Sequence, residues 1–177
     1  MMHDLVAHFR APKGSLTTCS LPTDAQTACA CCALAGATLT VNNTPLCLVC
    51  APAYAADEEQ IDRHAALIWM PQLDQGSLSR LIRAAWSTLL VCSPGQPARD
   101  RALVILDDLS ERRQTAAEKI GTYHPSRLRH AVSTLPPHQM LKRQGVASGL
   151  RILPVAAWRE QNSEALSKLL LNGNPAR

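Results

Sequence analysis

Four cysteines in the first third of the chain are spaced for binding a metal ion. Cys29 and Cys32 are separated by two residues, Cys47 and Cys50 repeat that spacing, and fourteen residues separate the pairs. The pattern C-x2-C-x14-C-x2-C is typical of a zinc site, because the short gap lets both thiolates of a pair turn toward one ion. Four sulfur ligands at about 2.3 Å complete the tetrahedron around Zn²⁺ and leave no position for water or substrate. The sequence therefore predicts a structural zinc ion.

Other interpretations of the cysteines stay open at this point. Cysteines also occur as small apolar core residues or as oxidised pairs. Cys31 lies inside the first pair and could replace Cys29 or Cys32 as a ligand. Cys19 could be a remote ligand, although a loop thiol fits it better, and Cys92 ends an apolar run in which a buried thiol is expected.

The cysteine count and the N-terminal residues indicate the cellular compartment. Seven cysteines are an odd number, and residues 1–13 lack the apolar core of a signal peptide. Both features favour a reducing compartment. No stretch approaches the roughly 20 apolar residues that a membrane span needs, since the longest candidate, residues 78–91, contains Arg80 and Arg83. We expect a soluble cytoplasmic protein.

The segments around the cysteines predict a small zinc-binding unit. Thr38–Val41 is β-prone, Asn42-Asn43 suits a tight turn, and Thr44–Leu46 continues as the second strand of a hairpin. A helix is expected to begin at Cys47–Cys50 and to run into Ala51–Glu59, with its dipole favouring the two thiolates. Knuckle, hairpin and a helix carrying the second ligand pair follow in the order of a treble-clef zinc finger. The predicted class is α+β.

The remaining elements are mainly helical. Apolar residues recur with helical spacing from Leu78 to Leu90, which predicts a helix capped by Ser77 with Arg80 and Arg83 off its apolar face. Trp69 and Trp86 are interpreted as core residues. The other predicted elements are a short strand at 66–70, helices at 98–120, 126–135, 137–147 and 164–171, and an extended segment at 150–155.

The predicted organisation has three parts. Residues 1–28 have no clear pattern, residues 29–92 form the zinc module with the helix that follows it, and residues 98–171 form a mainly helical part packed on the module. At 177 residues, the chain fits one compact unit.

The basic residues are concentrated in one segment. Residues 99–143 hold nine Lys or Arg against five Asp or Glu, a net charge of +4 that accounts for the whole excess of the chain. Such a surface could bind nucleic acid or an acidic protein segment. The arginines are spread over several elements without interleaved aromatic residues, so a solvated helix face is the default interpretation.

The sequence contains little that indicates an enzyme. It has no local nucleophile motif, no glycine-rich phosphate loop and no H-E-x-x-H helix. A remote alternative is an HNH endonuclease, because those enzymes also use a treble clef that two C-x-x-C pairs can staple. They need a histidine base, usually between the pairs, where this chain has neither a histidine nor an acid, and His64 lies fourteen residues beyond Cys50. We therefore predict no catalytic residues.

Several motifs together resemble a known family. Cys29-Ala30-Cys31-Cys32 and Cys47-Leu48-Val49-Cys50 are followed by Leu67-Ile68-Trp69-Met70-Pro71-Gln72-Leu73 and later by Gly149-Leu150-Arg151-Ile152-Leu153-Pro154. This order resembles the IcmJ family, also called DotN, of Dot/Icm-type (type IVB) secretion and conjugation systems. The resemblance spans about residues 29–155, and its most specific part is the segment 67–73.

The resemblance implies a function as well as a fold. Members of the family have a zinc-containing, HNH-like fold without nuclease activity and act as adaptors on the coupling ATPase at the inner membrane. The implied partners are the C-terminal region of that DotL-like ATPase and other subunits of the coupling complex, with contact to the membrane only through the partner. Only the metal ligands Cys29, Cys32, Cys47 and Cys50 carry over, because the resemblance includes no partner-contact motif. Residues 1–28 match nothing in the family pattern.

Overall fold

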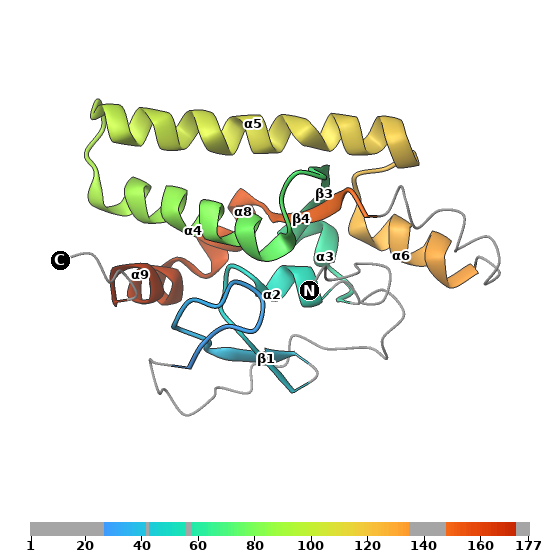
Figure 1. The fold of residues 1–177 in the computed structure, drawn as a ribbon, viewed down its shortest axis with the longest axis horizontal. Coiled ribbons are helices and arrows are strands. Elements are labelled where there is room, and N and C mark those ends of the chain that lie inside the picture. Colours follow the sequence, from blue (N-terminus) through green and yellow to red (C-terminus); the bar gives the residue numbers. More distant parts are fainter. Residues whose placement is uncertain (1–26, 42, 56–57, 135–147, 173–177) are drawn as a thin grey trace.

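The protein combines helices with two small antiparallel sheets, which confirms the predicted α+β class. The computed structural model describes residues 27–41, 43–55, 58–134 and 148–172. The strands are β1 (Leu39–Val41), β2 (Thr44–Leu46), β3 (Ala65–Trp69) and β4 (Leu150–Pro154). The helices are α2 (Ala51–Tyr54), α3 (Ile61–His64), α4 (Gln75–Val91), α5 (Pro97–Ile120), α6 (Pro125–Thr134), α8 (Ala156–Gln161) and α9 (Ser163–Asn172). Figure 1 shows α5 along one side of the molecule and the β1–β2 hairpin on the opposite side.

The first sheet is the predicted hairpin of β1 and β2. Leu39 pairs with Leu46, and Val41 pairs with Thr44 across the turn. Asn43 adopts the left-handed conformation with φ of 60°, which asparagine tolerates better than most residues. The hairpin buries Leu39, Val41 and Leu46 toward the cysteines.

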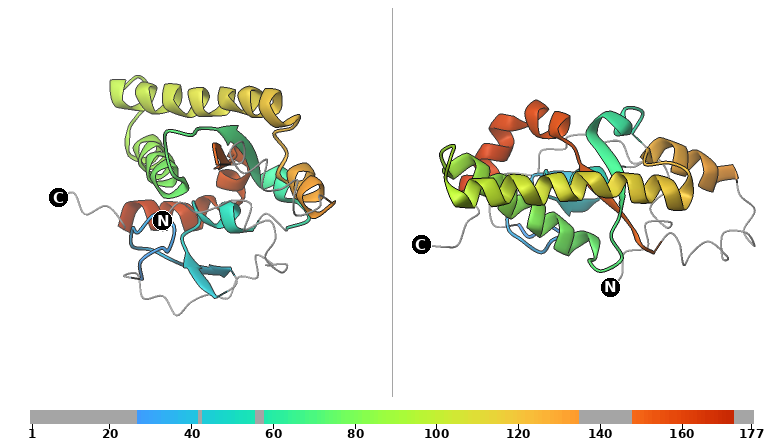
Figure 2. Two further views of the ribbon diagram at one scale, coloured as in Figure 1. Left: turned by 45° about the vertical axis from the view of Figure 1, so that its right-hand side comes forward. Right: turned by 90° about the horizontal axis from the view of Figure 1, so that it is seen from above.

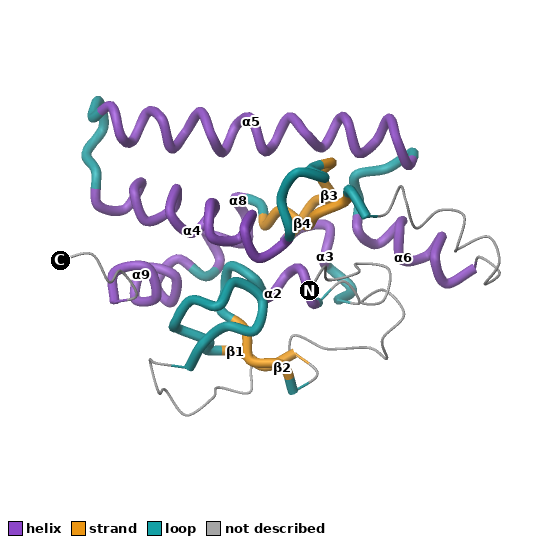
Figure 3. The backbone as a smooth tube through the Cα atoms, viewed as in Figure 1, coloured by secondary structure: helices purple, strands orange, loops and turns teal. Residues whose placement is uncertain are grey.

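The second sheet joins the two halves of the chain. β3 and β4 are antiparallel, with Ala65 opposite Pro154 and Trp69 opposite Leu150. Side chains on successive residues of a strand point to opposite faces. Leu67 and Ile152 accordingly face one apolar cluster, whereas Ile68 and Leu153 face another, and all of these side chains are buried. Figure 3 shows this sheet enclosed by helices.

Two apolar clusters form the core. The metal-side core surrounds the cysteines and brings together residues of the hairpin, β3, α4, α5, α8 and α9, among them Leu46, Ile68, Leu78, Ile82, Trp86, Leu109, Trp158, Leu166 and Leu169. The α6-side core lies on the other face of the second sheet and contains Ala53, Ile61, Ala65, Leu67, Ala116, Val132, Leu150 and Ile152.

The two longest helices form an antiparallel pair (Figure 2). α5 packs on α4 and on β3. Arg99 closes the turn between the helices, because its Nη1 atom donates hydrogen bonds to the carbonyl oxygens of Leu89 and Cys92. Gly121 ends α5 in the left-handed conformation, with φ of 80°, so the helix ends at Ile120 as predicted.

The structure corrects some of the predicted helix boundaries. Asp74, not Ser77, caps α4: the Asp74 side chain accepts a hydrogen bond of 2.7 Å from the Ser77 backbone N–H. Ser163 is the first residue of α9, and the short helix α8 before it was not predicted. The predicted helix at 137–147 lies outside the described residues.

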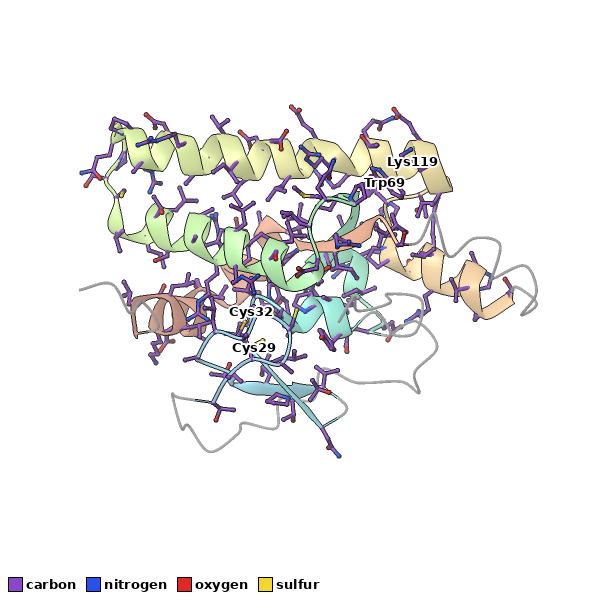
Figure 4. The ribbon with its side chains drawn as sticks, viewed as in Figure 1. Cys29, Cys32, Trp69 and Lys119 are labelled. Carbon is purple, nitrogen blue, oxygen red and sulfur yellow. The ribbon has the colours of Figure 1, made fainter. Side chains whose placement is uncertain are left out.

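One of the two predicted core tryptophans is less buried than the other. On α5, Leu109 and Ala116 are buried, whereas Ile105 is exposed. Trp86 is buried in the metal-side core. Trp69 is only half-buried, and the Lys119 ammonium lies 4.7 Å from the centre of its ring. Figure 4 shows the two side chains next to each other near the C-terminal end of α5.

None of the described helices combines the length and the apolar character that are needed to cross a membrane.

Candidate metal centre

The four predicted ligands come together in one buried cluster. The Sγ atoms of Cys29, Cys32, Cys47 and Cys50 all lie within 4.8 Å of one another. Cys32 Sγ and Cys47 Sγ are 3.9 Å apart. Four sulfurs at about 2.3 Å from one zinc ion would be about 3.8 Å apart. The cluster could therefore hold a tetrahedral metal ion with only small adjustments.

The first cysteine pair lies on a tight turn. The Cys29 N–H donates to the Leu34 carbonyl at 2.9 Å, and the Ala33 N–H donates to the Cys29 carbonyl at 2.8 Å. Ala33 has φ of 61°, a conformation that is uncommon outside glycine. The turn brings both thiols of the pair to the same side, as Figure 4 shows for Cys29 and Cys32 between α4 and the hairpin.

The second cysteine pair lies on the turn that leads into α2. The N–H groups of Cys50 and Ala51 both donate to the Cys47 carbonyl at 3.0 Å. The predicted helix from Cys47–Cys50 through Ala51–Glu59 is wrong in its extent: α2 covers only Ala51–Tyr54, and Cys50 is its N-cap. Both thiols therefore precede the helix and do not lie within it.

The N-terminal half of α4 covers the first pair. A side chain at Gly76 would collide with the Cys31 carbonyl oxygen, so the helix backbone touches the turn directly. Arg80 Nη1 donates to the Cys32 carbonyl at 3.1 Å, and Arg83 Nη1 donates to the Ala35 carbonyl at 2.8 Å. These bonds give side-chain partners to carbonyl groups of the loop that carries the first cysteine pair.

Sequence reasoning missed the role of these arginines. They were predicted to lie off the apolar face of α4, yet Arg83 is only 5% exposed. The available signal was their spacing, since residues three apart on a helix share one side. Two arginines on the same side of an otherwise apolar helix indicate backbone carbonyl groups as partners.

Helix α8 contacts the loop that carries the second cysteine pair. Trp158 is buried, and its Nε1–H donates to the Leu48 carbonyl at 2.9 Å. Leu48 lies between the two cysteines of the pair. Residues 110 positions apart are thereby joined at the metal centre.

The electrostatics of the cluster favour a cation at its centre. Hydrogen bonds from Cys32, Cys47 and Cys50 hold the pKa of the Cys29 thiol below its ordinary value. The pKa of Cys32 is lowered to about 7, because hydrogen bonds from Cys47 and Cys50 outweigh the raising effect of Cys29. The same contacts with Cys29 raise the pKa of Cys47 and of Cys50. Four buried thiolates repel one another unless a metal ion compensates their charge.

Two of the other cysteines, Cys31 and Cys92, lie outside the cluster. Cys31 is half-buried beside it, where a hydrogen bond that the Cys50 thiol donates to Cys31 contributes to the raised pKa of Cys50. Cys92 follows α4 and is half-buried, so the prediction of a buried thiol there is wrong. Cys19 lies outside the described residues.

No second metal-binding group is found among the residues that the structure describes. His64 is on α3, where its ring makes an edge contact of 5.2 Å with Trp158. Asp62 accepts hydrogen bonds from the backbone N–H and the hydroxyl of Ser126, and so caps the start of α6. The His124 Nδ1 atom lies 3.7 Å from the same carboxylate. This group therefore has a helix-capping role.

Comparisons with known proteins add no assignment: no protein-family model matches the chain, and no curated protein matches it.

Proposed function

We propose that the chain is a zinc-stabilised, non-catalytic adaptor that binds the coupling ATPase of a type IVB secretion or conjugation system and helps to assemble its substrate-receiving platform. The observation that carries the proposal is the closed set of four buried sulfurs. Such a site uses all positions of the metal for protein ligands and therefore stabilises a fold.

The order of elements around the cluster supports a treble-clef, HNH-like unit. The first knuckle is followed by the β1–β2 hairpin, and the second knuckle leads into α2. Cys29, Cys32, Cys47 and Cys50 would hold the zinc ion, and the metal would supply folding energy. Structural zinc sites contribute about 10–16 kcal/mol at neutral pH.

The positions of the motifs behind the IcmJ resemblance support the adaptor role. The segments 67–73 and 149–154 are far apart in the sequence, but residues of both pair in the β3–β4 sheet. The side chain of Arg151 in the second segment donates to the backbone carbonyl of Leu73 in the first. The residues that carry the resemblance thus form one structural unit beside the metal centre.

Nuclease activity is disfavoured by the composition of the hairpin. The segment between the cysteine pairs contains no histidine and no acidic residue that could act as a base. Among the described residues, Asp62 lies 3.7 Å from His124 Nδ1 and accepts a hydrogen bond from the Ser126 backbone N–H at the start of α6.

Native mass spectrometry of the protein purified from its own cells tests the proposal. One zinc ion per chain together with a large ATPase subunit supports the adaptor role. One zinc ion without an ATPase, in cells in which the ATPase is abundant, contradicts that role and leaves the metal centre standing.

A nucleic-acid-binding module is the alternative outcome. Its signature is binding to DNA or RNA that weakens steeply as salt rises, because bound cations are released from the phosphates. Changing Arg112, Arg113, Arg127 and Arg129 to glutamate should then abolish binding. If DNA binding is absent or unaffected by these changes, this alternative fails.

A further inference from the structure

Two adjoining hollows form a groove between the α4–α5 pair and the helices α8 and α9. The hollows have volumes of about 390 and about 380 Å³. Both are lined by Trp86, Leu89, Leu103 and Arg159, so they are two halves of one depression. We call this depression the α5 groove. The helices that border it, α4, α5, α8 and α9, are labelled in Figure 1.

The α5 groove has an apolar floor that reaches the surface. Trp86 is buried beneath it, and Leu90 and Leu103 on its rim are 48% and 42% exposed. Exposed apolar side chains gathered in one place with polar residues around them mark protein-binding or ligand-binding surfaces.

The groove has the length of a short helix. From α5 it is lined by Arg99, Leu103, Leu106, Ser110 and Arg113, which recur at intervals of three or four residues and form one helix face. Arg99 and Arg113 are fourteen residues apart on α5. At 1.5 Å per residue the groove extends for about 21 Å, which matches about four turns of a partner helix.

Three arginines are distributed along the groove. Arg99 lines the first hollow, Arg113 lines the second, and Arg159 lines both. Within the described part of the chain, none of them forms an ion pair with a carboxylate. Arg99 and Arg113 donate only to backbone carbonyls, so their charge is not neutralised. The groove also contains Asp107 and Glu160, which leaves a net charge of +1.

The charge argues against occupation by the chain's own remaining segments. Residues 1–26 contain two basic and two acidic residues, residues 135–147 contain two basic and no acidic residues, and residues 173–177 contain only one arginine. None of these segments is acidic. The groove therefore suits a segment of another protein.

We infer that the α5 groove binds an acidic amphipathic helix of a partner protein. The leucine face of such a helix would cover Leu103 and Leu90, and its flanking carboxylates would face Arg99, Arg159 and Arg113. This inference rests on the proposed adaptor function, because it names the kind of segment that the adaptor holds.

The test uses the full-length, zinc-loaded protein and a fluorescein-labelled 16-residue helical peptide. The peptide carries leucines at i, i+3, i+4 and i+7 with glutamates beside them, and a second peptide carries lysines in place of the glutamates. We expect saturable binding of the glutamate peptide in fluorescence anisotropy, at least tenfold tighter than binding of the lysine peptide. Absence of saturable binding, or equal binding of the two peptides, overturns the inference.

Matched variants locate the binding site. Leu103→Asp should weaken binding at least tenfold, whereas Val104→Asp, on the neighbouring position that is 67% exposed and outside the groove, should change it less than twofold. Arg159→Glu should weaken the glutamate peptide and strengthen the lysine peptide. Arg101→Glu, on an exposed part of α5 outside the groove, is its control. Equal effects of groove and control variants overturn the inference.

Two further measurements separate this inference from the proposed function. If the Leu103→Asp protein still co-purifies with the coupling ATPase at wild-type yield, the groove is not the ATPase-binding site and the adaptor role stands. If the peptide binds in the groove but no ATPase co-purifies from cells, the adaptor proposal fails and the groove stands. A dimer in sedimentation velocity that Leu103→Asp converts to a monomer would assign the groove to a second copy and overturn the inference.

Discussion

At the scale of single residues, the stability of the fold depends on buried thiols and buried backbone carbonyl groups that have few possible hydrogen-bond or metal partners. Four thiols share one site, and the carbonyl groups of the loops around them are satisfied by side chains of Arg80, Arg83 and Trp158. An unpaired buried polar group costs about 1–3 kcal/mol. Changes at these residues should therefore have larger effects than changes at the surface.

Cys47→Ser should remove the metal ion and unfold the region around it. The loss of about 10–16 kcal/mol of metal-binding energy matches or exceeds the total stability of a typical domain, about 5–15 kcal/mol. We expect zinc content, measured by elemental analysis, to fall from about one ion per chain to near zero. The control is Cys92→Ser, at a half-buried cysteine outside the cluster. A Cys47→Ser protein that stays folded and keeps its zinc would refute the assignment.

Gln75 joins the start of α4 to the second sheet through two hydrogen bonds. Its Nε2 atom donates to the Ile152 carbonyl, and its Oε1 atom accepts from the Ile152 N–H, both at 2.8 Å. Gln75→Ala leaves both backbone groups buried without a partner, so we expect a loss of about 2–6 kcal/mol in urea unfolding. Gln114→Ala, on the exposed face of α5, should cost less than about 0.5 kcal/mol. Equal losses in the two variants would mean that the paired bonds contribute nothing specific.

At the scale of elements, the start of α4 explains why local patterns predict helices better than their boundaries. The apolar spacing from Leu78 onward fixes the body of the helix and its buried face. Ser77 and Asp74 are both good capping residues, and the sequence pattern does not distinguish them. Which of the two residues caps α4 depends on where the chain turns after β3. The position of this turn is set by contacts with residues far away in the sequence.

The Asp74 cap gives α4 a defined dependence on pH. The backbone N–H of Ser77, the largest contributor, holds the pKa of Asp74 below its ordinary value. A carboxyl with a lowered pKa in the folded state stabilises the protein above the unfolded pKa of about 3.9 and loses this effect as pH falls through the folded value. Asp74→Ala should therefore cost about 1 kcal/mol equally at pH 7 and pH 5.

The conservative variant Asp74→Asn separates the cap from the charge. Asparagine retains the capping oxygen, so it should lose only a few tenths of a kcal/mol at pH 7. Urea unfolding of the three proteins at pH 7 and pH 5 provides the measurement. A cost of Asp74→Ala that already declines between pH 7 and pH 5 would contradict the lowered pKa.

At the scale of the whole molecule, the ligands and most elements follow from the sequence, but their arrangement does not. The spacing of the cysteines predicts the four-sulfur cluster because both pairs are local in the chain. The segments at 66–70 and 150–155 are each recognisable as extended, yet nothing local indicates that β3 and β4 pair. The cover of the metal centre by Trp158 likewise depends on a contact between residues 110 positions apart.

This long-range pairing predicts that the zinc module does not fold by itself. In a fragment of residues 27–92, Leu67 would lose Leu150, Ile152 and Ala116 from the α6-side core, because all three lie beyond the fragment. α4 would also lose α5 and α9, on which it packs.

We expect a zinc-loaded fragment to show dispersed amide signals in a two-dimensional NMR spectrum only for the cysteine turns and the hairpin. Adding a separate fragment of residues 96–177 should restore dispersion for β3 and α4, since the pairing surfaces are then present. The prediction is wrong if the first fragment alone gives dispersed signals for all of its residues. Residues 27–92 would then be an independent domain, and the pairing of β3 with β4 would only join two units that fold separately.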